Sequence, residues 1–202
     1  MKKHLAIMAL VMMMNSCTPS QKINADDSLL ELAQNRRSVR QYTDDAIDRE
    51  TIEKILSVAA LAPSSYGQNP VEFVVVEGRE ALGRLADCKK IGAPSVRNAA
   101  AAVVVMADTE KGELWVEDSS VAAGYLLLAA EHYGVGACWN QIHLRDGSHK
   151  SASREICELL GIPTRYEVLC VVALGHKGEQ KAPRSAEHMR TGRIHFDKYS
   201  IK

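Results

Sequence analysis

The sequence predicts a single domain that mixes α-helices and β-strands around one core. Its 202 residues suffice for one well-filled core, whereas two full domains would be crowded. Segments with apolar residues at helical spacing alternate along the chain with short β-branched runs. The apolar share of 46% is ordinary for a globular protein. Aromatic residues make up only 5%, so the core must rest on Ala, Val, Leu and Ile.

The charge balance argues against a nucleic-acid partner. Lys plus Arg number 25 and Asp plus Glu number 25, which gives zero formal net charge. A nucleic-acid binder normally carries a basic excess or a basic face, and the sequence has neither.

The first residues predict a secretory leader rather than part of the fold. A basic start precedes the apolar run 5–14, which is too short to span a bilayer. Ser16 followed by Cys17 resembles a lipoprotein signal, which predicts a signal peptide over 1–16, a lipidated Cys17, a tether over 17–27 and a membrane-anchored protein of the cell envelope. Two alternatives are a plain cleaved signal and a cytoplasmic protein with a misassigned start codon.

The remaining cysteines lack the spacing of a redox or metal pair. None of Cys88, Cys138, Cys157 and Cys170 forms a C-x-x-C motif. The last three lie in apolar surroundings, as structural thiols do, and a chain of this size needs no disulfide framework.

Helices and strands are expected in alternation after residue 27. Helices are predicted at 29–33, capped by the group Asp26 to Ser28, at 48–62, ended by Pro63, at 79–89 and at 151–160. Strands are predicted at 72–76, 101–106 and 167–174, with a further short strand or loop from 137, after Gly134 and Gly136 stop the preceding helix.

The helix predicted over 113–133 indicates a second subunit. Its stretch 121–130 has almost no polar face, and a helix that is apolar all round must be buried on all sides. We therefore expect an obligate dimer, the alternative being a helix buried wholly within the monomer. The tail 176–202 carries Ile194, Phe196 and Tyr199, which a partner subunit would cover.

No familiar catalytic motif is present. The sequence lacks G-x-G-x-x-G, a Walker P-loop, H-E-x-x-H and G-x-S-x-G, and its histidines lack metal-ligand spacing. If the protein is an enzyme, a cofactor is expected to carry the chemistry.

The segment Arg36 to Arg40 is dense in groups that bind phosphate. Arginine offers planar, paired donors to an anionic oxygen, and Ser38 adds a hydroxyl. A solvated basic turn at the end of a helix is the alternative interpretation.

The segment Ala62 to Pro70 packs small and hydrogen-bonding residues between two prolines, directly before a buried strand. Such a loop can present hydroxyl, amide and backbone groups to a flat polar ring. An ordinary helix-to-strand loop explains the same residues.

In this order, the two segments resemble the FMN-dependent nitroreductase family over residues 28–202. Three further matches carry the resemblance: Gly134 to Trp139, Ala173 to Lys177, and His195 to Tyr199. It implies an α+β sandwich with a central, mostly antiparallel sheet flanked by helices. It also implies an entwined homodimer with FMN at two interface sites and a tail that wraps around the partner.

The resemblance also implies which residues bind FMN. Arg36, Arg37 and Ser38 would hold the phosphate and ribityl end, and Arg40 would lie near the pyrimidine edge. Further contacts would come from Ser64, Ser65 and Asn69 of the partner, from backbone at Cys138, Trp139 and Asn140 near N5, and from Gly175, Lys177 and Arg184 at the phosphate. The loop departs from the family pattern at Gly67, Asn69 and Val71, where Asn, Gln and an aromatic residue are usual.

The implied activity is that of an NAD(P)H oxidoreductase. It would reduce nitroaromatics, quinones or similar electron-poor molecules by ping-pong hydride transfer through flavin N5, without a dedicated catalytic side chain. NAD(P)H is a cytoplasmic reductant, so an exported protein would need another donor. The alternatives are a non-enzymatic FMN-binding electron-carrier lipoprotein and a flavin-free binding module.

Overall fold

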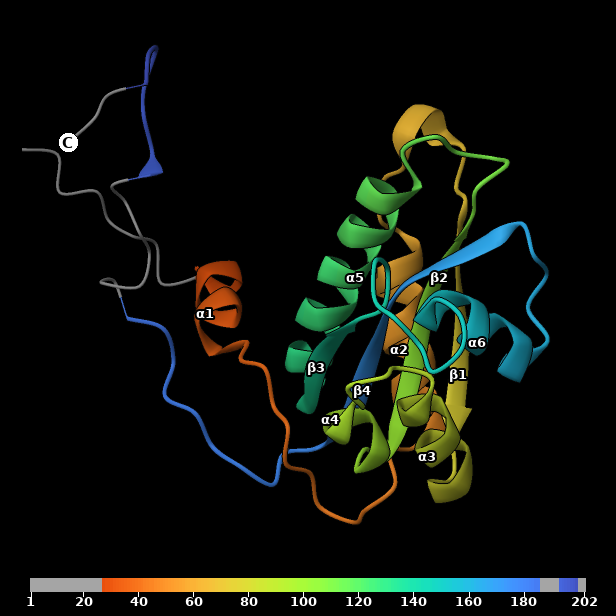
Figure 1. The fold of residues 1–202 in the computed structure, drawn as a ribbon. Coiled ribbons are helices and arrows are strands. Elements are labelled where there is room, and N and C mark those ends of the chain that lie inside the picture. The colour runs from red at the N-terminus through yellow and green to blue at the C-terminus, as the bar shows by residue number, and fades with distance from the viewer. Residues whose placement is uncertain (1–26, 186–192, 200–202) are drawn as a thin grey trace, which may run out of the picture.

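The computed structural model describes residues 27–185 and 193–199 (Figure 1). The predicted signal peptide 1–16, Cys17 and all of the tether except Asp27 lie outside these residues. Within the described part of the chain, no helix is long and apolar enough to cross a membrane.

A four-stranded sheet forms the centre of the molecule. Its strands are β1 (Val71–Glu77), β2 (Ala101–Asp108), β3 (Val135–Gln141) and β4 (Tyr166–His176). They lie in the order β1-β2-β4-β3, and each neighbouring pair is antiparallel. The three predicted strands are therefore confirmed, and the segment from 137, predicted as a strand or a loop, is part of a strand.

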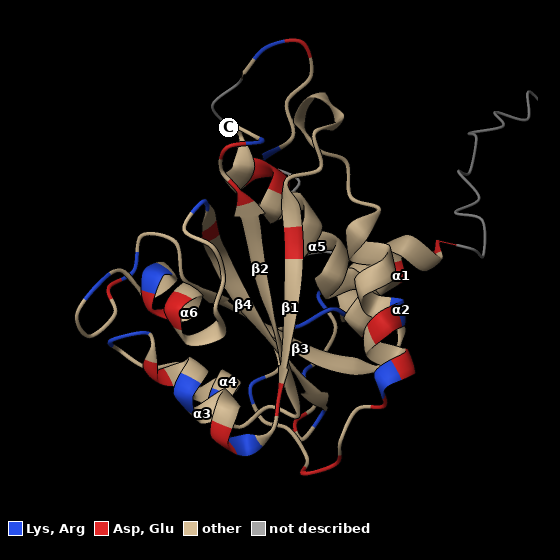
Figure 2. Ribbon diagram, turned by 90° about the vertical axis from the view of Figure 1, so that its right-hand side faces the viewer, with Lys and Arg blue, Asp and Glu red and all other residues tan. Residues whose placement is uncertain are grey.

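Helices cover both faces of this sheet. One face packs against α2 (Arg49–Ala60) and α5 (Trp115–His132), with α1 (Ser28–Asn35) beside α5. The other face packs against α3 (Arg79–Asp87), α4 (Pro94–Arg97) and α6 (Ala152–Leu160). Figure 2 shows the resulting three layers, which confirm the predicted α+β sandwich.

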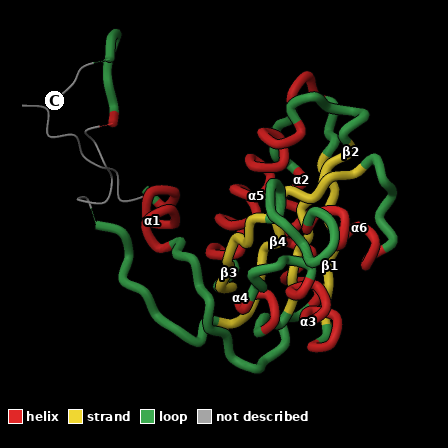
Figure 3. Tube along the Cα trace, in the orientation of Figure 1, coloured by secondary structure: helices red, strands yellow, loops and turns green. Residues whose placement is uncertain are grey.

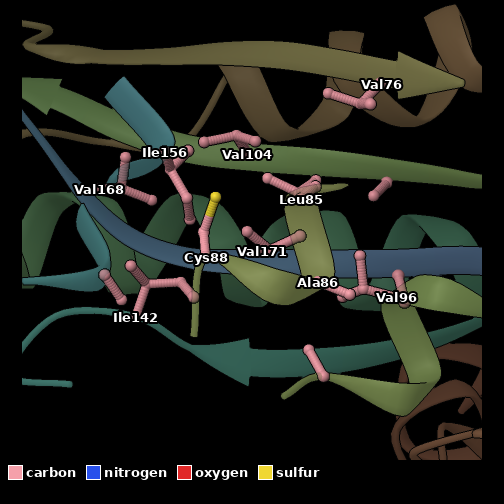
Figure 4. Close-up of a cluster of buried hydrophobic side chains, with 14 of the residues drawn as sticks. Val76, Leu85, Ala86, Cys88, Val96, Val104, Ile142, Ile156, Val168 and Val171 are labelled. Carbon is pink, nitrogen blue, oxygen red and sulfur yellow. The ribbon is translucent and has the colours of Figure 1, made fainter. Parts of the chain in front are cut away.

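The alternation of side chains along the strands divides the core in two. In β2, Val103 and Val105 pack toward α2 and α5, whereas Val104 packs toward α3 and α6. Figure 4 shows the second of these clusters, where Leu85 of α3 and Ile156 of α6 meet the sheet. Because both faces are covered, β2 is buried along its whole length, as its apolar sequence predicts.

Most helix ends follow the predicted signals, but the start of α1 does not. The Asp48 carboxylate accepts the backbone N–H of Thr51 at 2.7 Å, and Ser151 caps α6 in the same way. At α1, Asp27 takes the capping position but its side chain makes no such bond. Its φ of −86° and ψ of 47° lie outside the extended region that caps adopt. The predicted cap is therefore wrong.

Gly136 does not stop the preceding helix, because it lies inside β3. A Cβ atom there would lie 2.9 Å from Cγ1 of Val39, so the glycine permits the chain to approach the strand closely. Gly134, with a φ of 74°, does follow the end of α5. The helix α4 was not predicted, because its four residues are too few to show a period.

Helix α5 is not buried on all sides by its own chain. Ala122, Ala123 and Leu126 are buried against the sheet, but Val121 is 40% exposed and Tyr125 is 39% exposed. The alternative of a helix buried wholly within the monomer is therefore wrong, and the dimer stays a prediction. The sequence predicts that a second subunit covers this outer face.

Candidate functional site

The arginine-rich segment runs along the free edge of β3. After α1 ends, Ser38 forms a parallel bridge with Ala137, and the backbone N–H of Val39 donates to the carbonyl of Ala137 at 3.0 Å. The segment therefore extends the sheet by a short stretch beyond its last strand.

The residues that follow β4 return beside the same segment. The N–H of Gly178 donates to Gln41 at 2.9 Å, and the N–H of Arg184 donates to Gln34 at 3.0 Å. Figure 3 shows both stretches as loops, one leading from α1 toward the sheet and the other leaving the end of β4. The fold thus brings the predicted residues Lys177 and Arg184 to the arginine-rich segment, although they are far away in sequence.

A cavity of about 260 Å³ lies between these stretches and the end of α5. It is lined by Asn35, Arg37, Val39, Glu131, Lys177, Glu179, Gln180 and Lys181. Beside it, the pKa of Arg36 lies below its ordinary value because the side chain is partly buried and because Arg184 is close, with Arg37 adding to the effect. Crowded cations of this kind favour a bound anion.

Two carboxylates neutralise the lysines of this cluster but not the arginines. Lys177 Nζ lies 2.7 Å from Glu131 Oε1, and Lys181 Nζ lies 3.0 Å from Glu179 Oε1. Among the described residues, no ion pair joins Arg36, Arg37 or Arg184 to a carboxylate, and the Arg37 guanidinium donates to the carbonyl of Ala182. The positive charge that no ion pair offsets therefore lies on the arginines, although Glu131 acts on Arg36 in the direction that raises its pKa.

Sequence reasoning missed Glu131, Glu179 and Lys181. Glu131 offered a signal, since it is the single carboxylate in the apolar stretch 121–133. Glu179 and Lys181 lie in a polar tail, where nothing in the sequence distinguishes them.

Ser38 and Arg40 occupy the outer side of this cluster. The Ser38 carbonyl accepts from Lys181 Nζ at 2.6 Å, and the backbone N–H of Arg40 donates to Glu179 Oε1 at 2.6 Å. The Arg40 side chain is exposed. Both predicted residues thus belong to the cluster, with Ser38 held through its backbone.

Gly175 contacts a tyrosine of the arginine-rich segment. A Cβ atom at Gly175 would lie 2.6 Å from the ring of Tyr42, so the glycine lets this ring lie flat on β4. The Tyr42 hydroxyl donates to the Val39 carbonyl at 2.7 Å, and burial raises its pKa. Gly175 therefore leaves room for the Tyr42 ring to pack against β4.

The proline-framed loop is tied to the start of α5. The backbone N–H and the hydroxyl of Ser65 both donate to Asp118 Oδ1, at 2.8 and 2.9 Å. Asn69 bonds within the loop, since its N–H donates to Ser64 Oγ at 2.8 Å and its side-chain amide donates to the Gly67 carbonyl at 3.0 Å. Sequence reasoning missed Asp118, which stands in a polar run and carries no distinctive pattern.

The three predicted residues of β3 differ in the direction of their backbone hydrogen-bonding groups. Hydrogen-bonding direction alternates along a strand, and the Ala137 carbonyl faces the outer edge toward Val39. The backbone of Trp139 therefore faces the same edge, whereas Cys138 and Asn140 direct theirs toward β4. Asn140 is also held by Ser95, whose hydroxyl donates to its Oδ1 at 2.8 Å.

Within one chain, the predicted residues form groups that lie apart. Asp118 is in the first turn of α5 and Glu131 is in the last. A rise of ~1.5 Å per residue puts them roughly 20 Å apart along the helix axis. One chain therefore does not bring Ser64, Ser65 and Asn69 to the arginine cluster.

Comparison with known proteins is consistent with this geometry. Residues 33–118 and 89–176 match the family described as the nitroreductase family. The chain is 37% identical over 178 residues to a protein of Archaeoglobus fulgidus named as an NADH dehydrogenase/NAD(P)H nitroreductase, a match that covers 86% of this chain and 99% of that protein.

Solved structures show the same fold. An FMN-dependent nitroreductase from Clostridium difficile R20291 superposes with a TM-score of 0.81 at 36% identity, covering 84% of this chain and 99% of that one. A protein of Desulfovibrio desulfuricans named as a nitroreductase, solved in complex with FMN, superposes with a TM-score of 0.64 at 26% identity, covering 81% and 95%.

Proposed function

Since this chain belongs to the nitroreductase family and is an oxidoreductase of that family, we propose that it is an FMN-dependent NAD(P)H oxidoreductase that acts as a homodimer. The observation that carries this proposal is the cluster of arginines without carboxylate partners beside the 260 Å³ cavity.

The residues present fit the phosphate of FMN. A phosphate monoester is a compact dianion, and arginines bind such groups through paired, charge-assisted hydrogen bonds. Arg36, Arg37 and Arg184 would hold it, because Lys177 and Lys181 are already neutralised by glutamates. A bound dianion would also offset the burial and the repulsion from Arg184 that together lower the pKa of Arg36.

The ring end of the site would come from a second copy of the chain. The loop with Ser64, Ser65 and Asn69 lies at the opposite end of α5 from the arginines, so a second subunit is needed to complete one site. This loop exposes Tyr66 and Asn69 to solvent.

The outer face of α5 supports such a dimer. A groove of about 480 Å³ beside it is almost wholly apolar, and its lining consists of Leu29, Leu32, Val58, Tyr125, Leu128, Ala129, His132 and Tyr133. Exposed apolar surface of this kind marks protein interfaces. The described tail adds Phe196, which is 84% exposed and lies in a stretch that stands apart from the sheet and its helices (Figure 1).

When bound, FMN supplies hydride exchange between NAD(P)H and an electron-poor acceptor such as a nitroaromatic or a quinone. The chain's own residues bind and orient it. Trp139 would offer backbone groups at the open edge of β3, and the exposed Arg40 would set a positive charge near the ring. No described side chain is needed as a dedicated acid or base.

The visible spectrum of the purified full chain tests the proposal. We expect a yellow protein, or one that becomes yellow on reconstitution with FMN, and that NADH or NADPH bleaches without oxygen. A chain that never binds FMN would overturn the proposal. A yellow chain that neither nucleotide bleaches would favour the electron-carrier alternative.

We also propose that Cys17 carries a lipid that anchors the protein in the cell envelope, on the strength of the leader sequence. Cells grown with a fatty-acid analogue should label the chain, and Cys17→Ala should abolish the label. Equal labelling of both would refute the anchor. NAD(P)H could then serve as the electron donor if the chain stays in the cytoplasm, whereas an exported chain would still need another donor.

A further inference from the structure

The loop 64–69 is held in a strained conformation. Tyr66 has a φ of 52°, Gly67 of 66° and Asn69 of 48°, all in the left-handed region. Outside glycine this region costs roughly 1–2 kcal/mol per residue. Two of the three residues are not glycine, so contacts elsewhere must hold the loop in this shape.

The side chain that ties this loop to the body is Asp118. It is only 4% exposed, and its Oδ1 accepts both the N–H and the O–H of Ser65. Because it lies in the first turn of α5, the positive end of the helix dipole stabilises its charge. These two hydrogen bonds therefore join a strained loop to a helix that packs against the sheet.

The second oxygen of this carboxylate has no partner. Asp118 Oδ2 is buried and makes no hydrogen bond, which is costly for a charged group. Asp118 lines a cavity of about 60 Å³ beneath the loop, together with Ser64 and Asn69. The Ser64 hydroxyl and the Asn69 side-chain amide can donate or accept hydrogen bonds, whereas the carboxylate can only accept, so its second oxygen requires a donor.

A water molecule meets this requirement. Its share of liquid volume is roughly 30 Å³, and a buried water needs two to four polar partners. We propose that Asp118 is a positioning residue for FMN: one oxygen holds Ser65, and the other holds Ser64 and Asn69 through a buried water. This inference rests on the proposed function, in which the loop contacts the flavin ring of the partner subunit.

The first test separates the ring end of the ligand from its phosphate. Asp118→Asn keeps the size of the side chain but removes its charge and one acceptor. We expect its dissociation constants for FMN and for riboflavin, measured by quenching of flavin fluorescence, to rise by the same factor of about 10, a loss of ~1.4 kcal/mol. Glu117→Gln removes an exposed carboxylate from the same helical turn and should leave both constants unchanged.

The second test uses the FMN-free chain and reads the loop directly. Chymotrypsin cleaves after exposed aromatic residues, and Tyr66 is 95% exposed. In Asp118→Asn we expect cleavage after Tyr66 to accelerate about 10-fold relative to cleavage after Phe196, which serves as a reference in the same chain. Ser65→Ala should accelerate this cleavage as well. The double variant should be cleaved little faster than either single variant, because both changes weaken the same interaction between Ser65 and Asp118.

The outcomes distinguish the two proposals. If the wild-type chain binds no flavin, the proposed function fails, while the cleavage test still decides whether Asp118 holds the loop. If the wild type binds FMN and Asp118→Asn keeps both its affinity and its resistance at Tyr66, the positioning role is overturned. Loss of affinity for FMN without loss for riboflavin would overturn it too.

Discussion

The two ends of α5 carry opposite charges, and each sign matches the helix dipole. At the N-terminal end, Asp118 lies buried in the first turn. At the C-terminal end, Lys177 pairs with Glu131, and Arg184 lies close to Arg36. The negative end of the dipole attracts cations, and the positive end stabilises a carboxylate. The helix thus contributes to both halves of the proposed site.

This arrangement differs from the usual phosphate site. Many phosphates are bound at the N-terminus of a helix by free backbone N–H groups. Here the helix presents its C-terminus, which by itself repels an anion, and the arginines supply the attraction. The difference predicts that affinity for the phosphate of the ligand depends on side-chain charge. Affinity for the ring end of the ligand should instead depend on the conformation of the loop 64–69.

The largest effect should come from separating the two halves of the proposed site, the arginine cluster and the loop 64–69, because they belong to different subunits in the proposed dimer. Tyr125→Glu sets a charge on the outer face of α5 and should convert the dimer to monomer and abolish FMN binding. Size-exclusion chromatography with light scattering and an FMN titration measure both. Ile91→Glu changes an exposed apolar residue between α3 and α4, the helices on the other face of the sheet, and should change neither. A monomer that keeps its FMN affinity would contradict the shared site.

Removal of an arginine should weaken only the binding of the phosphate group. Charge-assisted hydrogen bonds contribute ~1.5–3 kcal/mol, so Arg36→Ala should weaken FMN about 10- to 150-fold. Riboflavin, which lacks the phosphate, should bind as it does to the wild type. Isothermal titration with both ligands measures the contrast, and Arg49→Ala on the exposed surface of α2 is the matched control. Equal losses of affinity for FMN and riboflavin would show that Arg36 does not bind the phosphate.

A smaller effect of the opposite sign is expected at Glu131. Glu131→Gln removes a negative charge from the cluster and releases Lys177, so FMN should bind about 5-fold more tightly. The FMN-free variant should melt at a lower temperature, because the cations then repel one another without compensation. Glu117→Gln, at the other end of α5, should show neither change. Weaker FMN binding in Glu131→Gln would indicate that the carboxylate positions the lysine for the ligand.

The smallest effect concerns pH. The Arg40 backbone N–H and Lys181 hold the pKa of Glu179 below its ordinary value of 4.5. A carboxyl group whose pKa is lower in the folded state stabilises the fold at any pH above its pKa in the unfolded state. This contribution is lost as the pH falls through the pKa of the folded state. Urea midpoints of wild type and Glu179→Gln should therefore differ at pH 7 and converge as the pH drops below 4.5. A constant difference across this range would refute the contribution.

Local patterns accounted for most of the fold and for part of the site. The β-branched run of β2 and the periodic helix α2 were readable because each depends on neighbours in sequence. The arginine-rich segment was readable because its groups are adjacent. The bond from Ser65 to Asp118 was not, since it joins residues that only the packed fold brings together. The same holds for the pairing of Glu131 with Lys177.

The approach of the arginine-rich segment to β3 has a consequence for solubility. Backbone groups at the edge of a sheet are a template for pairing with other chains, and proteins protect such edges. Here the protection comes from Val39 and its bond to Ala137, in the segment that also carries the arginines. An anion bound at the proposed site would lower the repulsion among those arginines and so help to keep the segment on the edge. We therefore expect the chain to aggregate most readily when no such anion is bound.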